Sequence, residues 1–338
     1  MLYVTTRSDG DVYTAYRALH ESRGVDGGLY LPFKPPYYHG EELEALLQLP
    51  FHGCVAEVLS RLFSVKLTGI DVEFAMGRRS VQLKNLGRRT IMAEAWHNPE
   101  GCYAYLERSI IKLMGKESTD SGSWPRIAVR IAIWFGMFAE ARRAGFRETM
   151  DVSVVSGDFA APISAWYGRL WGLPIGNIVC CCNENNALWD LFRYGQMRTE
   201  GISIPTDTPD ADITVPTDLE RLIYAYGGTG EVRKYLDAVQ LGKPYHVPEN
   251  MLEQLRKGMY VSVISGQRMK NTIPSVYRTH SHFLSPYGAL AYGGLLDYRA
   301  TADVPRYGLV LEEKSPALDK ETVAAALGVE PKEIQDYL

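Results

Sequence analysis

The sequence predicts an α/β fold built around a mostly parallel β-sheet. Runs rich in β-branched residues alternate with longer stretches of helical hydrophobic spacing. The clearest unit is residues 151–182, where DVSVVS, a helix opened by Pro162 and NIVCCC follow one another. A strand, a helix and a second strand in this order join two parallel strands. The 338 residues are enough for two domains, and 46% hydrophobic with 22% charged residues is typical of a globular protein.

The first 85 residues predict an N-terminal subdomain of small helices and short strands. Turn signals divide residues 1–50. EELEALLQLP predicts a short helix that ends before Pro50, and residues 51–65 carry apolar side chains at helical spacing. We therefore expect one unit over 1–85 and a larger α/β domain over 86–338.

The larger unit is expected to begin with a strand at residues 90–95, followed by a strong helix. Ser123 is placed to cap this helix and Gly145 to end it. Apolar residues such as Ile127 and Ile131 fall on one face, which predicts a helix with one buried side.

Further helices are predicted toward the C-terminus. Thr217–Glu220 has the capping-box pattern of a helix that ends near Gly227. PENMLEQLRKG and DKETVAAALG, residues 248–258 and 319–328, predict two more.

Cysteines and histidines of this sequence are candidate metal ligands. The chain has five cysteines, and the consecutive Cys180, Cys181 and Cys182 lack metal-binding spacing, so we expect them to fill a buried strand as free thiols. His280 and His282 would share one face of a strand, which suits a metal pair, but no third ligand has recognisable spacing. We expect no metal site, and solvated or hydrogen-bonded histidines instead.

Charge and hydropathy exclude several classes of function. A net charge of -4 argues against a general nucleic-acid binder, because phosphate neutralisation needs a basic face. No apolar run is long enough to cross a bilayer, and the polar, acidic start MLYVTTRSDGD is unlike a secretory signal. We therefore expect a cytoplasmic protein without nucleic-acid or membrane partners.

Five stretches lie in the order of landmarks in one enzyme family: GVDGGLYLP, LPFHGCVAEVLSRLF, WPRIAVRIAIWFGMF, LWGLPIGNIVCCCNENNALWDLF and VPTDLERLIY. They resemble threonine synthases, which are pyridoxal phosphate (PLP) dependent lyases. The resemblance implies the tryptophan synthase β-like fold, known as fold type II, with helices on both faces of a parallel sheet. It also implies that a second α/β subdomain, which covers the cofactor in the family, is largely deleted here, since about a dozen polar residues near 115–122 stand in its place.

The positions that carry the family's chemistry differ in this sequence. The catalytic lysine of the family's His-Gly-Pro-Thr-x-Ala-Phe-Lys-Asp string falls at Ala104. The phosphate loop Gly-Asn-Phe-Gly-Asn reads Gly157-Asp158-Phe159-Ala160-Ala161, which adds a Cβ and a negative charge where a dianion binds. The threonine that partners the ring nitrogen becomes Gly288, and the C-terminal Ala-Thr-Ala-His-Pro-Ala-Lys-Phe string becomes residues 312–319.

We therefore expect a protein that has lost PLP binding and catalysis, a pseudoenzyme that binds an amino-acid-like ligand or a protein partner. No cofactor is expected, with PLP as the cofactor if that interpretation is wrong. The alternatives are an active lyase of this family or a PLP-independent enzyme acting on an amino-acid-like or phosphorylated substrate. A homo- or hetero-oligomeric interaction protein is the third candidate.

A candidate ligand cleft is expected at the carboxyl ends of the strands, where open α/β sheets bind ligands. Tyr103, Tyr105 and Tyr287 would narrow it. Asp158 suits the cleft or a turn at the start of a helix, and Asn183–Asn186 suit the cleft or a helix cap near Ala187. His97 has no visible activating partner, which favours a structural role. The candidate lining residues are His97, Gly157, Asp158, Phe159, Asn183, Ser285 and Tyr287.

Overall fold

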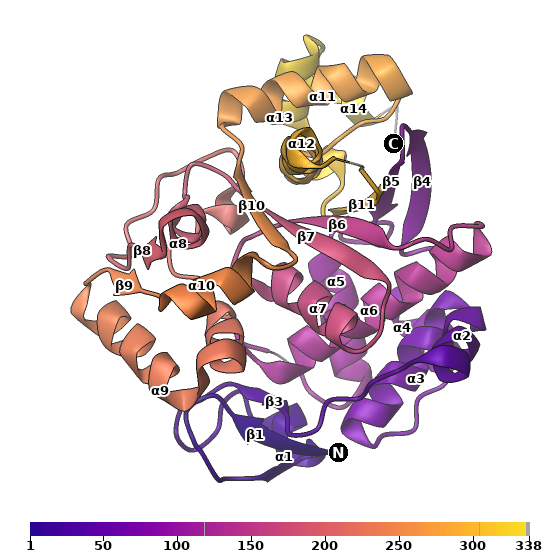
Figure 1. Cartoon of the computed structure of the whole chain (residues 1–338). Helices are drawn as coiled ribbons and strands as arrows, with labels where there is room; N and C mark the ends of the chain where they lie inside the picture. Colours follow the sequence, from indigo (N-terminus) through magenta and orange to yellow (C-terminus); the bar gives the residue numbers. More distant parts are fainter. Residues whose placement is uncertain (118, 304, 336–338) are drawn as a thin grey trace.

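The computed structural model describes residues 1–117, 119–303 and 305–335. Its centre is a six-stranded sheet with the strand order β10-β7-β6-β11-β5-β4 (Figure 1). All neighbouring strands run parallel except the edge strand β4, which is antiparallel to β5. The predicted α/β fold with a mostly parallel sheet is confirmed. The strands are β4 (Gln82–Gly87), β5 (Thr90–Glu94), β6 (Met150–Val155), β7 (Ile175–Cys182), β10 (Met259–Val263) and β11 (Tyr307–Glu312).

Helices cover both faces of this sheet. One face carries α5 (Tyr103–Leu113), α6 (Trp124–Arg143) and α7 (Ala160–Leu170), and the other carries α11 (Gly266–His280), α12 (Pro286–Thr301), α13 (Lys320–Leu327) and α14 (Pro331–Gln335) (Figure 1). Side chains of β7 alternate between the two cores, as the pleat of a strand requires. Cys180 and Cys182 belong to the larger hydrophobic core, whereas Cys181 belongs to the core that includes residues of α12. The three cysteines therefore fill a buried strand, as predicted.

The N-terminal part forms a small sheet and four helices. The sheet has the order β2-β1-β3, and helix α3 packs against α6. A Cβ added at Gly136 would lie 2.8 Å from the Phe51 ring, so only glycine permits this close approach of the two helices. The core is continuous across residue 85, and the division at that residue stays a prediction. The elements are β1 (Leu2–Thr5), β2 (Tyr13–Thr14), α1 (Ala15–His20), β3 (Tyr30–Pro32), α2 (Gly40–Gln48), α3 (Phe51–Phe63) and α4 (Gly69–Met76).

Helix α6 is buried on all sides, not on one face as the spacing of Ile127 and Ile131 predicted. Val129 and Ile133, which point the other way, are also fully buried. Helices that include α3, α5 and α7 pack against α6. Apolar residues are therefore needed all round the helix and not on one face only. Ser123 precedes the helix but makes no side-chain capping bond.

Helix α9 (Leu219–Leu241) departs from its predicted limits. The expected capping box is absent, because Asp218 occupies the N-cap position without a side-chain cap bond and the Glu220 carboxylate bonds Arg7 instead. The glycine pair near the predicted end is a kink: Gly228 has a φ of 65° and the helix continues beyond it.

The segment THSHF is not a strand. His280 is the last residue of α11 and His282 lies in the turn before α12, so the two histidines do not share a strand face. The predicted helices at 248–258 and 319–328 are present as α10 and α13. The remaining elements are α8 (Ala187–Tyr194), β8 (Gln196–Met197), η1 (Pro209–Ala211), β9 (Tyr245–His246), α10 (Glu249–Arg256) and η2 (Pro316–Asp319). No helix in the described ranges is both long and apolar enough to span a membrane.

Candidate functional site

A cleft of about 710 Å³ opens at the carboxyl ends of β6 and β11. Its walls are the first turn of α5, the start of α6, the loop after β6, the segment around η1 and the residues that follow β11. Ligands of open α/β sheets bind at this end of the strands, so the cleft lies where the sequence predicted a site.

Two arginines of α6 dominate one wall. Arg126 and Arg130 are four residues apart and therefore share a helix face. Arg126 pairs with Asp158 and, at 3.1 Å through Nε, with Glu107 of α5. Arg130 pairs with the same Glu107 and, at 2.5 Å, with Glu313 after β11. Two cations and three anions thus form one connected network.

The network shifts the pKa values of Asp158 and Arg130. Burial raises the pKa of the Asp158 carboxyl, but the Arg126 and Arg130 charges and the Ala160 N–H outweigh burial and hold that pKa below its ordinary value. Burial likewise lowers the pKa of Arg130, and the charges of Glu107 and Glu313 reverse the shift. The Arg130 guanidinium also lies 4.4 Å from the centre of the Tyr103 ring. The ionised forms of Asp158 and Arg130 are therefore favoured.

A second ion pair lies across the cleft. The Lys314 ammonium is 2.6 Å from Asp210 and lies 4.3 Å from the centre of the Tyr287 ring. The Tyr287 hydroxyl accepts a hydrogen bond of 3.1 Å from the Asp210 backbone N–H. Burial lowers the pKa of Lys314, but Asp210 and Tyr287 outweigh burial and raise that pKa above its ordinary value. The ammonium form is therefore favoured.

The loop between β6 and α7 places a carboxylate at a helix N-terminus. Gly157 and Phe159 adopt positive φ values of 44° and 74°, which turn the chain sharply. Asp158 Oδ1 accepts a hydrogen bond of 3.1 Å from Ala160 N, at the first residue of α7. Asp158 therefore fills both roles open to it from the sequence, since it lines the cleft and forms the turn. Its charge stands where the helix dipole favours an anion.

Gly288, at the start of α12, lies against the side chain of Glu312. A Cβ added at Gly288 would lie 2.9 Å from Glu312 Cδ and closer still to Oε1. Glu312 is fully buried and accepts hydrogen bonds from Ser285 N at 2.8 Å and from Ser285 Oγ at 3.0 Å. Any longer side chain at position 288 would compete with this carboxylate for the same space.

The structure brings only some of the predicted residues together. Gly157, Asp158 and Tyr287 line the cleft, and so does Tyr103. Phe159 is buried behind the loop, Ser285 caps α12, and Tyr105 is absent from the lining. The expectation that Tyr105 narrows the cleft is therefore wrong.

Two more predicted residues serve elsewhere. The His97 ring lies 2.6 Å from Glu94 Oε2, in a separate cavity, so the expectation that it has no partner is wrong. Glu94 stands three residues earlier, a spacing that could have revealed the pair. Asn183 is buried and donates to Thr206, Thr208 and Asp212, so it tethers the segment before α9 and does not line the cleft.

Sequence reasoning missed the charged residues that dominate the cleft: Glu107, Arg126, Arg130, Asp210, Glu313 and Lys314. One signal was present, because two arginines four residues apart inside an otherwise apolar helix must find partners. Their partners come from three distant segments, which no spacing in the sequence reveals.

This chain is similar in sequence to threonine synthases. A family model described as "Threonine synthase N terminus" matches residues 2–73. The chain is 24% identical to threonine synthase of Pseudomonas aeruginosa over 204 residues, covering 60% of this chain and 43% of that protein. It is 26% identical to threonine synthase of Methylobacillus glycogenes over 223 residues, covering 64% and 46%. The chain thus spans less than half the length of these two relatives.

Solved structures extend the likeness in fold to the whole chain. PLP-bound threonine synthase from Brucella melitensis superimposes with a TM-score of 0.87 at 19% identity, covering 98% of this chain and 92% of that one. Yeast threonine synthase gives a TM-score of 0.85 at 16% identity, covering 99% and 93%. The fold and the N-terminal match agree with the resemblance predicted from the sequence: this chain is similar to threonine synthases and shares their fold, the fold type II architecture.

Proposed function

We propose that this chain has lost PLP binding and threonine synthase chemistry, and that its cleft binds a small amino-acid-like ligand. One observation carries the proposal. Asp158, paired with Arg126, holds a negative charge at the N-terminus of α7, the place that the family resemblance assigns to the cofactor phosphate. A phosphate dianion there would be repelled by this carboxylate and would have to displace it from Arg126.

Two further positions do not fit PLP. Ala104, at the family's lysine position, is exposed and lines the cleft without an amine. At the ring-nitrogen position, Gly288 has no side chain, and the Glu312 carboxylate fills the space that a threonine would need. Cofactor chemistry of this kind requires both an amine and a ring partner.

Lys314 is the one lysine among the described residues that line the cleft. Its ammonium is committed to Asp210 and held over the Tyr287 ring. A Schiff base forms from the neutral amine, and these neighbours favour the ammonium form. Lys314 therefore makes a poor substitute for the missing lysine.

An amino-acid-like ligand suits the charges that remain. The lining presents cations and anions to one cavity, with Lys314 and Asp210 about a quarter and two thirds exposed. A zwitterion can exchange with such a pair, its carboxylate taking the place of Asp210 beside Lys314. Apolar neighbours such as Ile213 and Leu318 would contact an aliphatic side chain.

The first test measures PLP binding by the purified chain. We expect no visible Schiff-base absorption and no borohydride-trapped PLP on any lysine. A trapped adduct abolished in K314A would overturn the proposal and favour an active enzyme on a rebuilt site, as would turnover of phosphohomoserine.

The second test screens amino acids and phosphorylated amino acids by calorimetry against wild type, K314Q and the control R198Q. Arg198 is an exposed arginine paired with Asp190, outside the cleft. We expect binding by wild type and R198Q and at least tenfold weaker binding by K314Q. Equal binding by all three would place the ligand elsewhere. Oligomeric or heteromeric association stays a prediction.

A further inference from the structure

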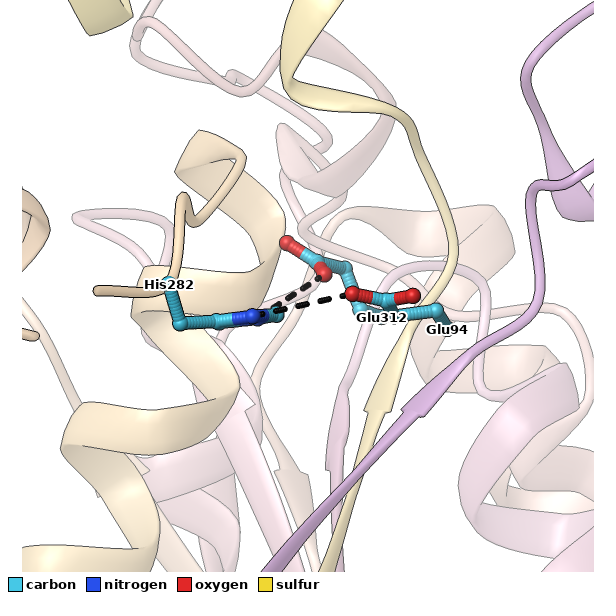
Figure 2. A group of neighbouring side chains, drawn as sticks. All are labelled: Glu94, His282 and Glu312. Carbon is cyan, nitrogen blue, oxygen red and sulfur yellow. Dashed lines mark ion pairs between the residues drawn. The ribbon is translucent and has the colours of Figure 1, made fainter. Parts of the chain in front are cut away.

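Three buried side chains meet beside the cleft, at the ends of two strands. Glu94 is the last residue of β5 and Glu312 the last of β11, and the two are direct neighbours across the parallel pair. Their side chains are 1% and 0% exposed. His282 approaches from the turn after α11, with its ring directed toward both carboxylates (Figure 2). Two buried carboxylates this close need a cation between or beside them.

The two ring nitrogens of His282 face different carboxylates, and neither is close enough for a hydrogen bond. His282 Nδ1 lies 3.6 Å from Glu94 Oε1, and His282 Nε2 lies 3.8 Å from Glu312 Oε2, both beyond hydrogen-bonding distance. One ligand atom from each residue can be chosen so that all lie within 4.8 Å of one another. Ligand atoms held about 2.0–2.2 Å from a divalent ion stand roughly 3.0–3.6 Å apart, so the side chains would have to close by about 1 Å around the ion.

The imidazole itself points to a missing partner. His282 is 5% exposed, and its Nε2 atom has no hydrogen-bond partner among the residues that the structure describes. A buried polar atom without a partner is uncommon and costs stability. A metal ion would satisfy it and both carboxylates together.

Neighbouring groups hold the carboxylates in place. Ser285 donates two hydrogen bonds to Glu312 Oε1, Trp96 Nε1 lies 3.3 Å from Glu312 Oε2, and the His97 ring binds Glu94 Oε2. Outer contacts of this kind orient metal ligands. Lys84 competes, because its ammonium is 2.7 Å from Glu94 Oε1, but it is half exposed and can swing into solvent.

A cavity of about 320 Å³ reaches the cluster from outside. Glu94, Trp96, His97 and His282 line it, together with Lys84 at its edge. It gives an ion a route to the ligands and leaves room for water at an open coordination position. One imidazole and two carboxylates are donors suited to zinc, manganese, iron or cobalt in the divalent state.

We propose that Glu94, His282 and Glu312 form a binding site for a divalent transition-metal ion. The site does not depend on what the neighbouring cleft binds. This proposal departs from the expectation of no metal site drawn from the sequence. Spacing in the sequence could not reveal the site, because Glu94 and Glu312 lie on strands far from His282 in the chain.

The test titrates chelator-treated full-length protein with cobalt, followed by its visible absorption, and with zinc, followed by calorimetry. We expect one saturable ion per chain. H282Q should lower the affinity at least a hundredfold. The matched control H280Q, changed at the end of α11 outside the cluster, should bind as wild type does.

A second variant tests the site without disturbing the core. K84A removes the competing ammonium from a half-exposed position on the edge strand, so it should fold normally and bind the ion about tenfold more tightly. Absence of stoichiometric binding, equal affinity in H282Q, or no gain in K84A would each overturn the proposal. Nuclear magnetic resonance showing a doubly protonated His282 imidazole that cobalt does not displace would do the same, because a proton would then balance the two carboxylates.

Discussion

The pairing of Gly288 with Glu312 makes a sharp prediction for G288A. Position 288 lies in the first turn of α12, where alanine is normally preferred to glycine by about 1 kcal/mol. The added methyl would meet the Glu312 carboxylate, which is fully buried and cannot move into solvent. We expect the substitution to destabilise the protein in spite of its helix preference.

The structure sets the magnitude. To make room, the carboxylate would have to give up its two hydrogen bonds from Ser285. Bonds to a charged acceptor contribute about 1.5–3 kcal/mol each, so their loss amounts to about 3–6 kcal/mol. Subtracting the gain from helix preference leaves a net loss of about 2–5 kcal/mol.

The assay is urea unfolding followed by circular dichroism, applied as a double-mutant cycle with E312A. In the E312A background the methyl meets no carboxylate, so G288A should become neutral or stabilising by up to about 1 kcal/mol. The control G230A adds a methyl to a helical glycine with no atom within 4 Å and should be stabilising in both backgrounds. The same loss from G288A with and without Glu312 would refute the reasoning.

Three further predictions concern the cleft and its surroundings. R126Q should destabilise the protein by about 3–5 kcal/mol in denaturant unfolding, because it leaves the partly buried Asp158 carboxylate without its arginine, whereas Glu107 keeps Arg130. Because the pKa of Asp158 is depressed in the folded state, its contribution to stability is present above about pH 4 and is lost as the pH falls further, so D158N should flatten the acid limb of a pH–stability curve. N183A removes three bonds to the segment before α9 and should speed its limited proteolysis, whereas N271A, at an exposed position of α11, should not.

The sequence was sufficient for the order of the main elements and for the identity of the fold. Patterns that depend on neighbours in the chain were reliable: the β6–α7–β7 unit and the buried cysteines of β7 are present as predicted. Predictions failed where tertiary contacts replaced a local rule. Glu220 bonds Arg7 and leaves the capping box unformed, and α6 is buried on all sides because helices α1, α2, α3, α5 and α7 surround it.

The site was predictable only in part, for a related reason. The loop of Gly157 and Asp158 stood out because its motif is continuous in the sequence. Arg130, Glu313 and Lys314 did not, since each gains its role from a partner far along the chain. The partner of His97 was predictable, because Glu94 lies only three residues earlier in the chain.

The departures from the family pattern are coupled in three dimensions, and this coupling is the physical argument for the proposed loss of cofactor binding. Asp158 is held by Arg126 at the helix terminus, and Glu312 fills the space left by Gly288. The phosphate and ring-nitrogen positions are thus both taken up by the protein's own groups. Restoring the amine alone, in A104K, should therefore give no stable Schiff base, since the phosphate position still holds a carboxylate. Spectrophotometric titration of A104K with PLP decides the matter: an absorption band as strong as that of a lysine-bearing relative would show that the lysine was the only loss that mattered.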